Sequence, residues 1–232
     1  MSNAVTRSTI RDMVRQRLDM VGSTFIGDSE FDGWIDRSTR KVFDLLVDAI
    51  GEDYYTTKTT FSTSANTSDY ALNTICGSNN FYKLRGIYLV NGTNRLGMNK
   101  ACLDEIVRYS ANNPTYTGWA TTKDPTDIVY CIFGDTLRFA PTPTAVCTCE
   151  IWYVPPFVGF ANDSATFDAV NGWDDYIVAD VCIKGGEKEE RDVSEFAQEK
   201  AEILQRIAKL RENRDRHQVY KVRDVQATGR WV

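Results

Sequence analysis

Few side chains in this sequence have the type and spacing that catalysis requires. The 232-residue chain has a single histidine, His217, which lies in a basic stretch near the C-terminus. Ser–His–Asp and Cys–His devices need an imidazole held rigidly against a nucleophile, so we interpret His217 as a solvated residue. The sequence contains no GxxxxGK[ST] or GxGxxG loop for binding phosphate. It therefore predicts no catalytic residue, and we expect the protein not to be an enzyme.

The cysteines and the adjacent carboxylates do not indicate a metal site. Zinc sites need clusters of Cys and His at ligand spacing, and Cys147 with Cys149 is the only close pair among six cysteines. On a strand both thiols would face the same side, which is typical of small core residues. Asp174 and Asp175 would diverge on a helix, where Asp174 suits the positive end of the helix dipole. We expect no metal, no cofactor and six reduced thiols.

Two aromatic pairs, Phe81-Tyr82 and Trp152-Tyr153, could stack on bases or sugars if a sheet exposed them. Binding of nucleic acid by that sheet would require clustered Lys and Arg. The chain outside residues 206–232 instead has a net charge of −10, so packing in the core is the favoured interpretation. A module that binds carbohydrate or another surface through its aromatic sheet is an alternative.

The C-terminal stretch has the opposite charge from the rest of the chain. Residues 206–232 contain eight Lys and Arg against three Asp and Glu, a net charge of +5. A basic segment attached to an acidic body indicates an acidic partner, although a solvated tail fits the composition equally well. Trp and Arg are also the residues that dominate interface hot spots. The candidate docking residues in this arm are Arg214, Arg216, Lys221, Arg223, Arg230 and Trp231.

Helical periodicity is present at both ends of the chain. We expect helices over residues 6–21 and from Asp28 or Ser29 to just before Gly51. Two further helices are expected over residues 173–184, where Gly185-Gly186 should interrupt the helix, and over residues 192–213. The apolar stripes of the first two helices are Ile10, Met13, Val14, Leu18 and Val21, then Phe31, Trp34, Ile35, Ser38, Val42, Leu45, Leu46 and Ala49.

The middle of the chain has the pattern of strands. Segments rich in Thr, Val and aromatic residues cover residues 54–62, 81–90, 127–140 and 144–154. Asn91-Gly92 and Gly134-Asp135 are hairpin signals, and a short helix over residues 102–110 would place Leu103, Ile106 and Val107 on one face. These segments predict an antiparallel sheet or small barrel of roughly five or six strands.

The predicted fold class is α+β, with one helical bundle formed by the N- and C-terminal helices and an antiparallel β lobe inserted between them. The expected segments are residues 1–52 and 159–213 for the bundle, 53–158 for the lobe and 214–232 for an extended basic arm. No run of about 18 apolar residues occurs, so we expect no membrane span. The N-terminal residues lack the apolar core of a signal peptide, so synthesis in a cytoplasm is expected.

Several short strings follow one another along residues 28–216. They are Gly51-Glu52-Asp53-Tyr54-Tyr55, the strand at residues 81–89, Leu137-Arg-Phe-Ala-Pro141-Thr-Pro143, Tyr153-Val-Pro155-Pro156, the segment at 172–178, and Lys188 to Asp192. In this order they resemble the head–tail connector (adaptor) proteins of tailed bacteriophages, which are ring subunits bound to the portal.

The resemblance implies a structural virion protein in the neck, assembled in the cytoplasm of the bacterial host. It implies a homo-oligomeric ring, usually of twelve copies, that contacts the portal protein and tail or nozzle proteins. DNA would pass through the ring lumen without specific binding, and the arm at residues 214–232 matches the C-terminal extension that grips the portal. A tail-side gatekeeper or tail-completion ring protein is the alternative within this class. The last helix and the helix that carries Trp34 are candidates for the contacts between subunits.

Overall fold

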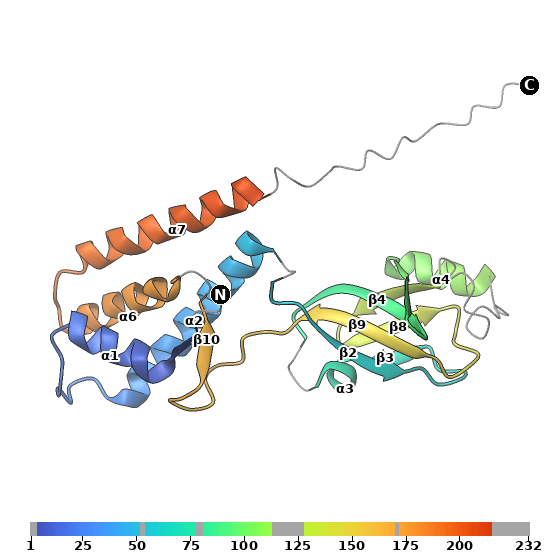
Figure 1. The fold of residues 1–232 in the computed structure, drawn as a ribbon, viewed down its shortest axis with the longest axis horizontal. Coiled ribbons are helices and arrows are strands. Elements are labelled where there is room, and N and C mark those ends of the chain that lie inside the picture. The colour runs from blue at the N-terminus through green and yellow to red at the C-terminus, as the bar shows by residue number, and fades with distance from the viewer. Residues whose placement is uncertain (1–3, 52–53, 78–80, 113–127, 170–171, 215–232) are drawn as a thin grey trace, which may run out of the picture. The chain divides into compact units, whose positions relative to one another are not determined.

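The computed structural model describes residues 4–51, 54–77, 81–112, 128–169 and 172–214. The chain divides into two compact units, shown in Figure 1. Residues 1–51 and 162–232 form the helical unit, and residues 52–161 form the β unit. Helices and mainly antiparallel sheets are both present, so the predicted α+β fold class is confirmed.

The described part of the helical unit contains four helices and one pair of short strands. They are α1 (Arg7–Arg17), α2 (Asp28–Ile50), α6 (Asp174–Lys188), α7 (Ser194–Arg214) and the antiparallel strands β1 (Ala4–Thr6) and β10 (Thr166–Asp168). Helix α6 packs against the other three helices (Figure 1). Its side chains are buried on nearly every side, Ile177 and Val181 among them, as expected of a helix at the centre of a bundle. Helices from both ends of the chain therefore share one core.

The first two helices form where their apolar spacing predicts them, but their ends and faces differ in detail. Helix α1 begins after Thr6, whose hydroxyl accepts a hydrogen bond from the backbone N–H of Thr9. It ends at Arg17 rather than at residue 21, because Asp19 has a φ of 54° and turns the chain away. Val21, predicted to belong to the apolar stripe, is therefore exposed. Trp34 on α2 is only half-buried.

The glycine pair predicted to interrupt the third bundle helix lies inside α6, so that prediction is wrong. A Cβ atom on Gly185 would lie 2.5 Å from Cδ1 of Leu18, and one on Gly186 would lie 2.5 Å from Cγ1 of Val193. The missing side chains thus let Leu18, at the end of α1, and Val193, just before α7, approach the backbone of α6 closely. Here glycine allows close packing rather than ending a helix.

The described β unit contains two four-stranded sheets, whereas the sequence predicted one antiparallel sheet or small barrel of roughly five or six strands. The first has the order β2 (Thr57–Ser62), β9 (Thr148–Val154), β4 (Lys83–Asn91), β5 (Asn94–Gly97). The second has the order β3 (Asp69–Ala71), β8 (Thr136–Ala140), β7 (Val129–Phe133), β6 (Asn99–Lys100). Strand β6 pairs with β7 in parallel. Both predicted hairpin turns are confirmed, with positive φ at Gly92 and Gly134.

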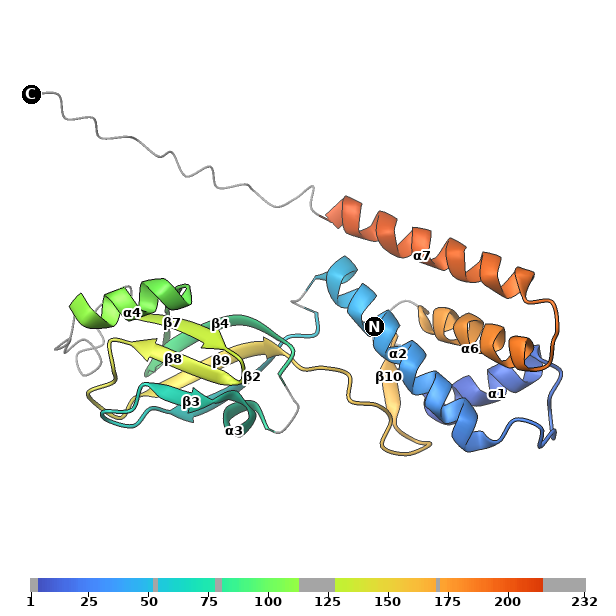
Figure 2. The same cartoon turned by 180° about the vertical axis from the view of Figure 1, so that it is seen from behind.

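The two sheets enclose the core of the β unit, which is seen from both sides in Figures 1 and 2. Its buried side chains include Ile87, Leu89 and Ile151 from the first sheet and Leu137 and Phe139 from the second. Leu72 and Cys76 of the short helix α3 (Leu72–Cys76) complete this cluster.

Helix α4 (Leu103–Asn112) packs on the second sheet of the β unit. Only one residue of its predicted apolar face is buried: Ile106 contacts Cys131 and Ala140, whereas Leu103 and Val107 are exposed. Within the described β unit the first sheet has no such cover, since α4 packs on the second sheet and α3 packs into the core. The two sides of the sandwich are therefore not equivalent.

Candidate docking site

The residues predicted to dock on a partner lie at and beyond the end of α7. Arg214 is the last residue of that helix. Arg216, Lys221, Arg223, Arg230 and Trp231 fall outside the described residues, as does His217. The structure therefore describes the base of the arm, which is helix α7, and the contacts that hold this helix against the bundle.

The apolar contact of α7 with the bundle is narrow. Over its described side chains, only Ile203 and Ile207 are buried, with 5% and 3% of their surface exposed. Phe196 and Leu204 are half-buried, and Leu210 is 40% exposed. Two buried side chains are few for a helix of 21 residues, so polar contacts must contribute much of its attachment.

A buried carboxylate on α6 supplies the main polar contact. The side chain of Asp180 is only 4% exposed, and it accepts hydrogen bonds from Lys184 Nζ at 2.6 Å and from Lys200 Nζ of α7 at 2.5 Å. Ser38 Oγ of α2 donates a third at 2.5 Å, and Lys41 Nζ lies 3.8 Å away. The Asp180 cluster, defined by these residues, thus joins α2, α6 and α7.

The protonation state of Asp180 follows from this setting. Burial alone raises the pKa of a carboxyl group, but the hydrogen bonds from Lys184, Lys200 and Ser38 outweigh burial and hold the pKa of Asp180 well below its ordinary value. The pKa of Lys200 is raised: desolvation opposes its charge, and the hydrogen bond to Asp180 more than compensates. Both groups are therefore charged at neutral pH, as a paired buried charge should be.

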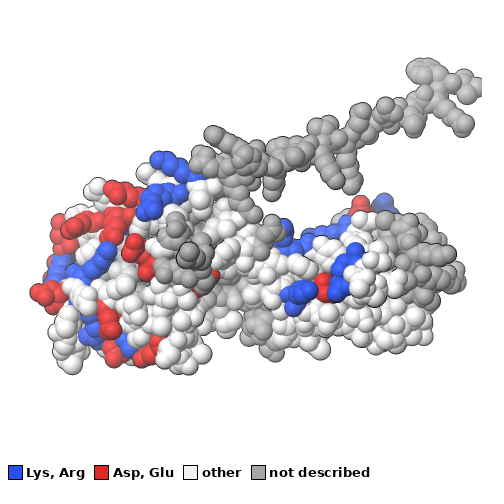
Figure 3. Space-filling view, viewed as in Figure 1, with Lys and Arg blue, Asp and Glu red and all other residues white. Residues whose placement is uncertain are grey.

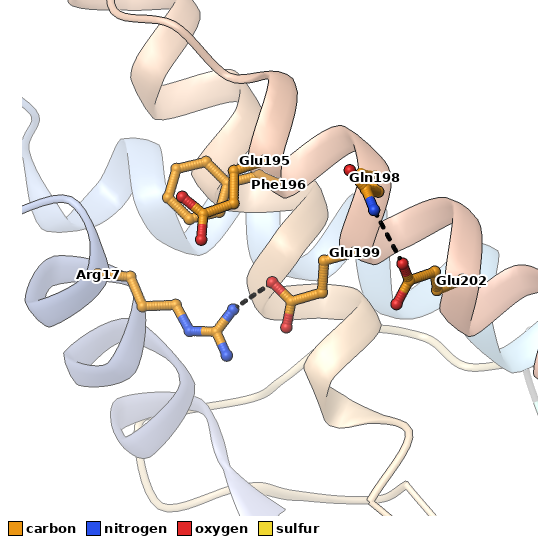
Figure 4. A pocket seen from close by; sticks show the side chains of 6 residues that line it. All are labelled: Arg17, Glu195, Phe196, Gln198, Glu199 and Glu202. Atoms are coloured by element: carbon orange, nitrogen blue, oxygen red, sulfur yellow. Dashed lines mark hydrogen bonds and ion pairs between the residues drawn. The ribbon is translucent and has the colours of Figure 1, made fainter.

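A second set of contacts fastens the N-terminal half of α7. Arg17 of α1 donates a hydrogen bond of 2.6 Å to Glu199, which raises the pKa of Arg17 above its ordinary value. Figure 4 shows this pair in an open hollow of about 580 Å³ between α1 and α7. The hollow is also lined by Glu195, Phe196, Gln198 and Glu202. Further along α7, Arg206 lies 5.0 Å from the ring centroid of Trp173.

Helix α1 carries a ladder of arginines that was not predicted from the sequence. Arg7, Arg11 and Arg15 follow one another at four-residue spacing, and their side chains are only 12–16% exposed. Each bonds a carboxylate: Arg7 Nη2 to Asp163 at 2.7 Å, Arg11 Nη1 to Asp32 and Nη2 to Asp163 at 2.8 Å, and Arg15 Nη2 to Asp28 at 2.7 Å. The ladder joins α1 to α2 and to the turn before β10. Its guanidinium groups are already engaged by carboxylates, which indicates a structural role.

The outer face of the first sheet in the β unit carries a cluster that we call the Trp152 cluster: Lys58, Tyr88, Arg95, Glu150 and Trp152. Glu150 is 2% exposed and accepts a hydrogen bond of 2.6 Å from the indole N–H of Trp152. Arg95 Nε lies 3.3 Å and Lys58 Nζ 3.7 Å from its other oxygen. Burial would raise the pKa of Glu150, but these contacts outweigh burial and lower it.

The aromatic pairs do not both pack in the core as predicted, because successive strand residues face opposite sides. Tyr153 is buried and Phe81 packs against the core, whereas Trp152 and Tyr82 are 37% and 39% exposed. All six cysteines are free thiols, four of them buried. Asp174 lies in the first turn of α6 as predicted, and burial raises its pKa.

The described residues contain no group of three or more His, Cys, Asp or Glu side chains that could hold a metal ion. A search of the described helices finds none long and apolar enough to cross a membrane. The buried Asp180 and the half-buried arginines of α1 are matched by opposite charges, which join elements of the helical unit. The geometry is that of an assembled scaffold with a basic extension.

The sequence profile of SU10 adaptor proteins matches residues 5–226, from β1 through the whole of α7 and into the arm. The chain belongs to the SU10 adaptor protein family. No curated protein matches the chain. Membership of this family confirms that the chain is a phage adaptor protein, which is a structural class rather than an enzymatic one. The family match includes both units and four of the six predicted docking residues, Arg214, Arg216, Lys221 and Arg223.

Proposed function

We propose that this protein is the head–tail adaptor of a tailed phage. Copies of the chain form a closed ring, of twelve subunits in the form that the resemblance implies, between the portal and the tail or nozzle proteins. Residues 1–52 and 159–213 form the body of each subunit, 53–158 the β lobe, and 214–232 the arm that docks on the portal. The protein is then a component of the virion neck, assembled in the host cytoplasm, and DNA passes through its lumen without being read.

The observation that carries this proposal is the way α7 is fixed at the base of the arm. Asp180 of α6 pairs with Lys200 and Arg17 of α1 pairs with Glu199, so paired charges join the N-terminal half of α7 to α6 and α1. Asp180 also accepts a hydrogen bond from Ser38 of α2. The helix then continues to Arg214, where the basic residues of the arm begin. A helix fixed in this way gives the arm a defined point of origin, so less conformational freedom is lost when the arm binds.

The charge of the arm favours a protein partner with an acidic surface. Residues 214–232 contain five Lys and Arg against two Asp and Glu, and they include Trp231. Arg and Trp are enriched among the residues that dominate binding energy at interfaces. Because the association is between opposite charges, it should weaken as salt is added.

The carbohydrate-binding alternative has less support. A sugar stacks on an open aromatic face, whereas Lys58 Nζ lies 5.3 Å from the ring centroid of Trp152 and the Tyr88 ring packs edge-on against it at 6.1 Å. These contacts occupy the ring that such a site would use. The exposed aromatic residue is better placed to contribute to a protein interface.

The role of the arm can be tested with two variants of the full-length protein. Deletion of residues 214–232 removes no described strand and only the last residue of α7, so the truncated protein should melt at the same temperature and fail to co-sediment with portal rings. A matched variant keeps the arm length but replaces Arg216, Lys221, Arg223 and Arg230 with Gln, and it should bind at least about tenfold more weakly. Normal portal binding by the truncated protein would exclude the arm as the anchor.

A further inference from the structure

The first sheet of the β unit has one side in the core and one side that no described element of this unit covers. Its inner side carries Ile87, Leu89 and Ile151, which are at most 1% exposed. On the outer side, Lys58 of β2 is opposite Trp152 of β9, and Trp152 is opposite Gly86 of β4. Neither described helix of the β unit, α3 or α4, lies over this face, whereas α4 covers the outer side of the second sheet. An exposed sheet face with an ordered aromatic cluster is the kind of surface that binds a partner.

The Trp152 cluster is held in place before any partner arrives. The indole N–H of Trp152 is bonded to Glu150, and the Tyr88 ring lies over Gly86, where a Cβ atom would be only 3.3 Å from the ring. Glycine therefore makes room for Tyr88, which in turn packs against Trp152. Side chains fixed in this way lose little rotamer freedom on binding.

The outer face of this sheet presents positive charge to solvent. Its carboxylate, Glu150, is 2% exposed and already contacts two cations, whereas the side chains of Lys58 and Arg95 are 56% and 40% exposed. Arg85 is exposed at the β-bulge of β4, next to Gly86. In Figure 3, the visible face of the β unit shows more basic than acidic side chains.

The helical unit has the complementary charge. Without the arm, residues 1–51 and 162–213 contain 14 Lys and Arg against 21 Asp and Glu, a net charge of −7. The N-terminal half of α7 concentrates part of this charge: Glu195 and Glu202 are exposed beside Glu199 in the hollow of Figure 4. Two cations of this region are engaged by other carboxylates, Arg17 by Glu199 and Lys200 by Asp180. The surface of this half of α7 is therefore acidic.

We propose that the outer face of the first sheet docks against the acidic half of α7 in a second copy of the chain. The proposal rests on the proposed ring function, and it names the two surfaces that meet between neighbours. Lys58 and Arg85 face Glu195 and Glu202 of the other copy, and Trp152 is the aromatic anchor between them. Such a contact is heterologous, because one copy uses its sheet and the other its helix. Heterologous contacts are the kind that close into rings.

A charge swap in the full-length protein tests this contact. Lys58→Glu with Arg85→Glu should weaken self-association by more than about tenfold, because like charges then face each other. Glu195→Lys with Glu202→Lys should weaken it in the same way, and a chain that carries all four changes should recover it. Ring formation is measured by mass photometry with and without portal protein, and thermal melts confirm that each variant is folded.

A matched control reverses the charge of two exposed basic side chains elsewhere in the β unit. Lys100→Glu with Arg108→Glu gives the same net charge but changes β6 and α4, and it should leave the rings intact. Should Lys58→Glu/Arg85→Glu prevent folding, Lys58→Gln/Arg85→Gln replaces it. The proposed contact would be overturned if the folded Lys58/Arg85 variant formed rings normally. It would also be overturned if the chain with all four changes failed to recover ring formation. Neither result would contradict the adaptor function. An unaltered protein that forms no ring even with the portal would instead contradict the proposed function.

Discussion

Lys200 of α7 donates a hydrogen bond of 2.5 Å to Asp180 of α6, a carboxylate that is almost fully buried. The link joins the last described helix to the centre of the bundle. A buried ion pair contributes little net stability compared with an apolar pair of the same shape, but its geometry is demanding, and breaking it is costly. We therefore interpret this pair as a device that sets the position of α7, and with it the origin of the arm.

Replacement of Asp180 with Asn should destabilise the helical unit. The change removes the negative charge that pairs with Lys184 and Lys200 and replaces one acceptor oxygen with an NH₂ donor. We expect a loss of about 2–3 kcal/mol in the free energy of unfolding, below the largest values for buried pairs because both lysines can reach water. The expected signs are a lower melting midpoint and faster hydrogen exchange at the amides of α7. Arg138→Ala, which breaks an exposed pair with Asp69, is the control and should cost less than about 1 kcal/mol. Equal losses in the two variants would argue against a special role for Asp180.

The contribution of Asp180 should depend on pH in a defined direction. Its pKa in the folded protein is lowered, so its stabilising effect is complete above the unfolded value of about 3.9 and is lost as the pH falls below it. The difference in unfolding free energy between the unaltered protein and the Asp180→Asn variant should therefore be constant from pH 7 to 5. It should shrink between pH 4 and 2, as followed by urea melts. A difference that does not change with pH would show that Asp180 is not charged in the folded state.

Gly185 provides a test of packing between α1 and α6. Gly185→Ala places a methyl group 2.5 Å from Cδ1 of the buried Leu18, and we expect a net cost of about 1–2 kcal/mol because overpacking exceeds the gain in helix propensity. Gly33→Ala is the matched control, since Gly33 lies in α2 with no atom within 4 Å of its Cβ position. That change should stabilise the protein by about 0.5–1 kcal/mol. Thermal melts in which both variants shift in the same direction would contradict this account of Gly185.

Trp34 lies at the edge of the bundle core rather than at its centre. It packs edge-on against Phe31, with ring centroids 5.8 Å apart, and remains partly exposed. Trp34→Ala should therefore cost about 1–2 kcal/mol, less than the removal of a fully buried Trp. A urea melt that shows a loss above 3 kcal/mol would mean that another copy of the chain buries this side chain.

The elements that depend on local pattern could be predicted from the sequence. Helix α2 was predictable because its buried residues recur at helical spacing, and the β4–β5 hairpin because Asn91-Gly92 suits a tight turn. Strands β3 and β6 were not, since three and two residues are too few to show a period. The pairing of β1 with β10 joins segments about 160 residues apart, which no local pattern reveals.

The candidate site was predictable only in part. Charge counting identified the basic arm, because charge is a property of composition. The Asp180 cluster was not identified, although Lys184 follows Asp180 at the i,i+4 spacing of a helical ion pair. Its other partners, Ser38 and Lys200, come from distant helices that meet only in the folded bundle. Similarly, alternation along a strand puts Glu150 and Trp152 on the same side of β9, but only the fold brings Arg95 to the carboxylate.

Electron microscopy of the purified protein mixed with the portal protein of the same phage tests the adaptor function most directly. If the protein is a head–tail adaptor, the images should show a closed ring of this chain stacked on the portal ring, with density for residues 214–232 extending onto the portal. A protein that remains monomeric and leaves the portal ring bare would contradict this function.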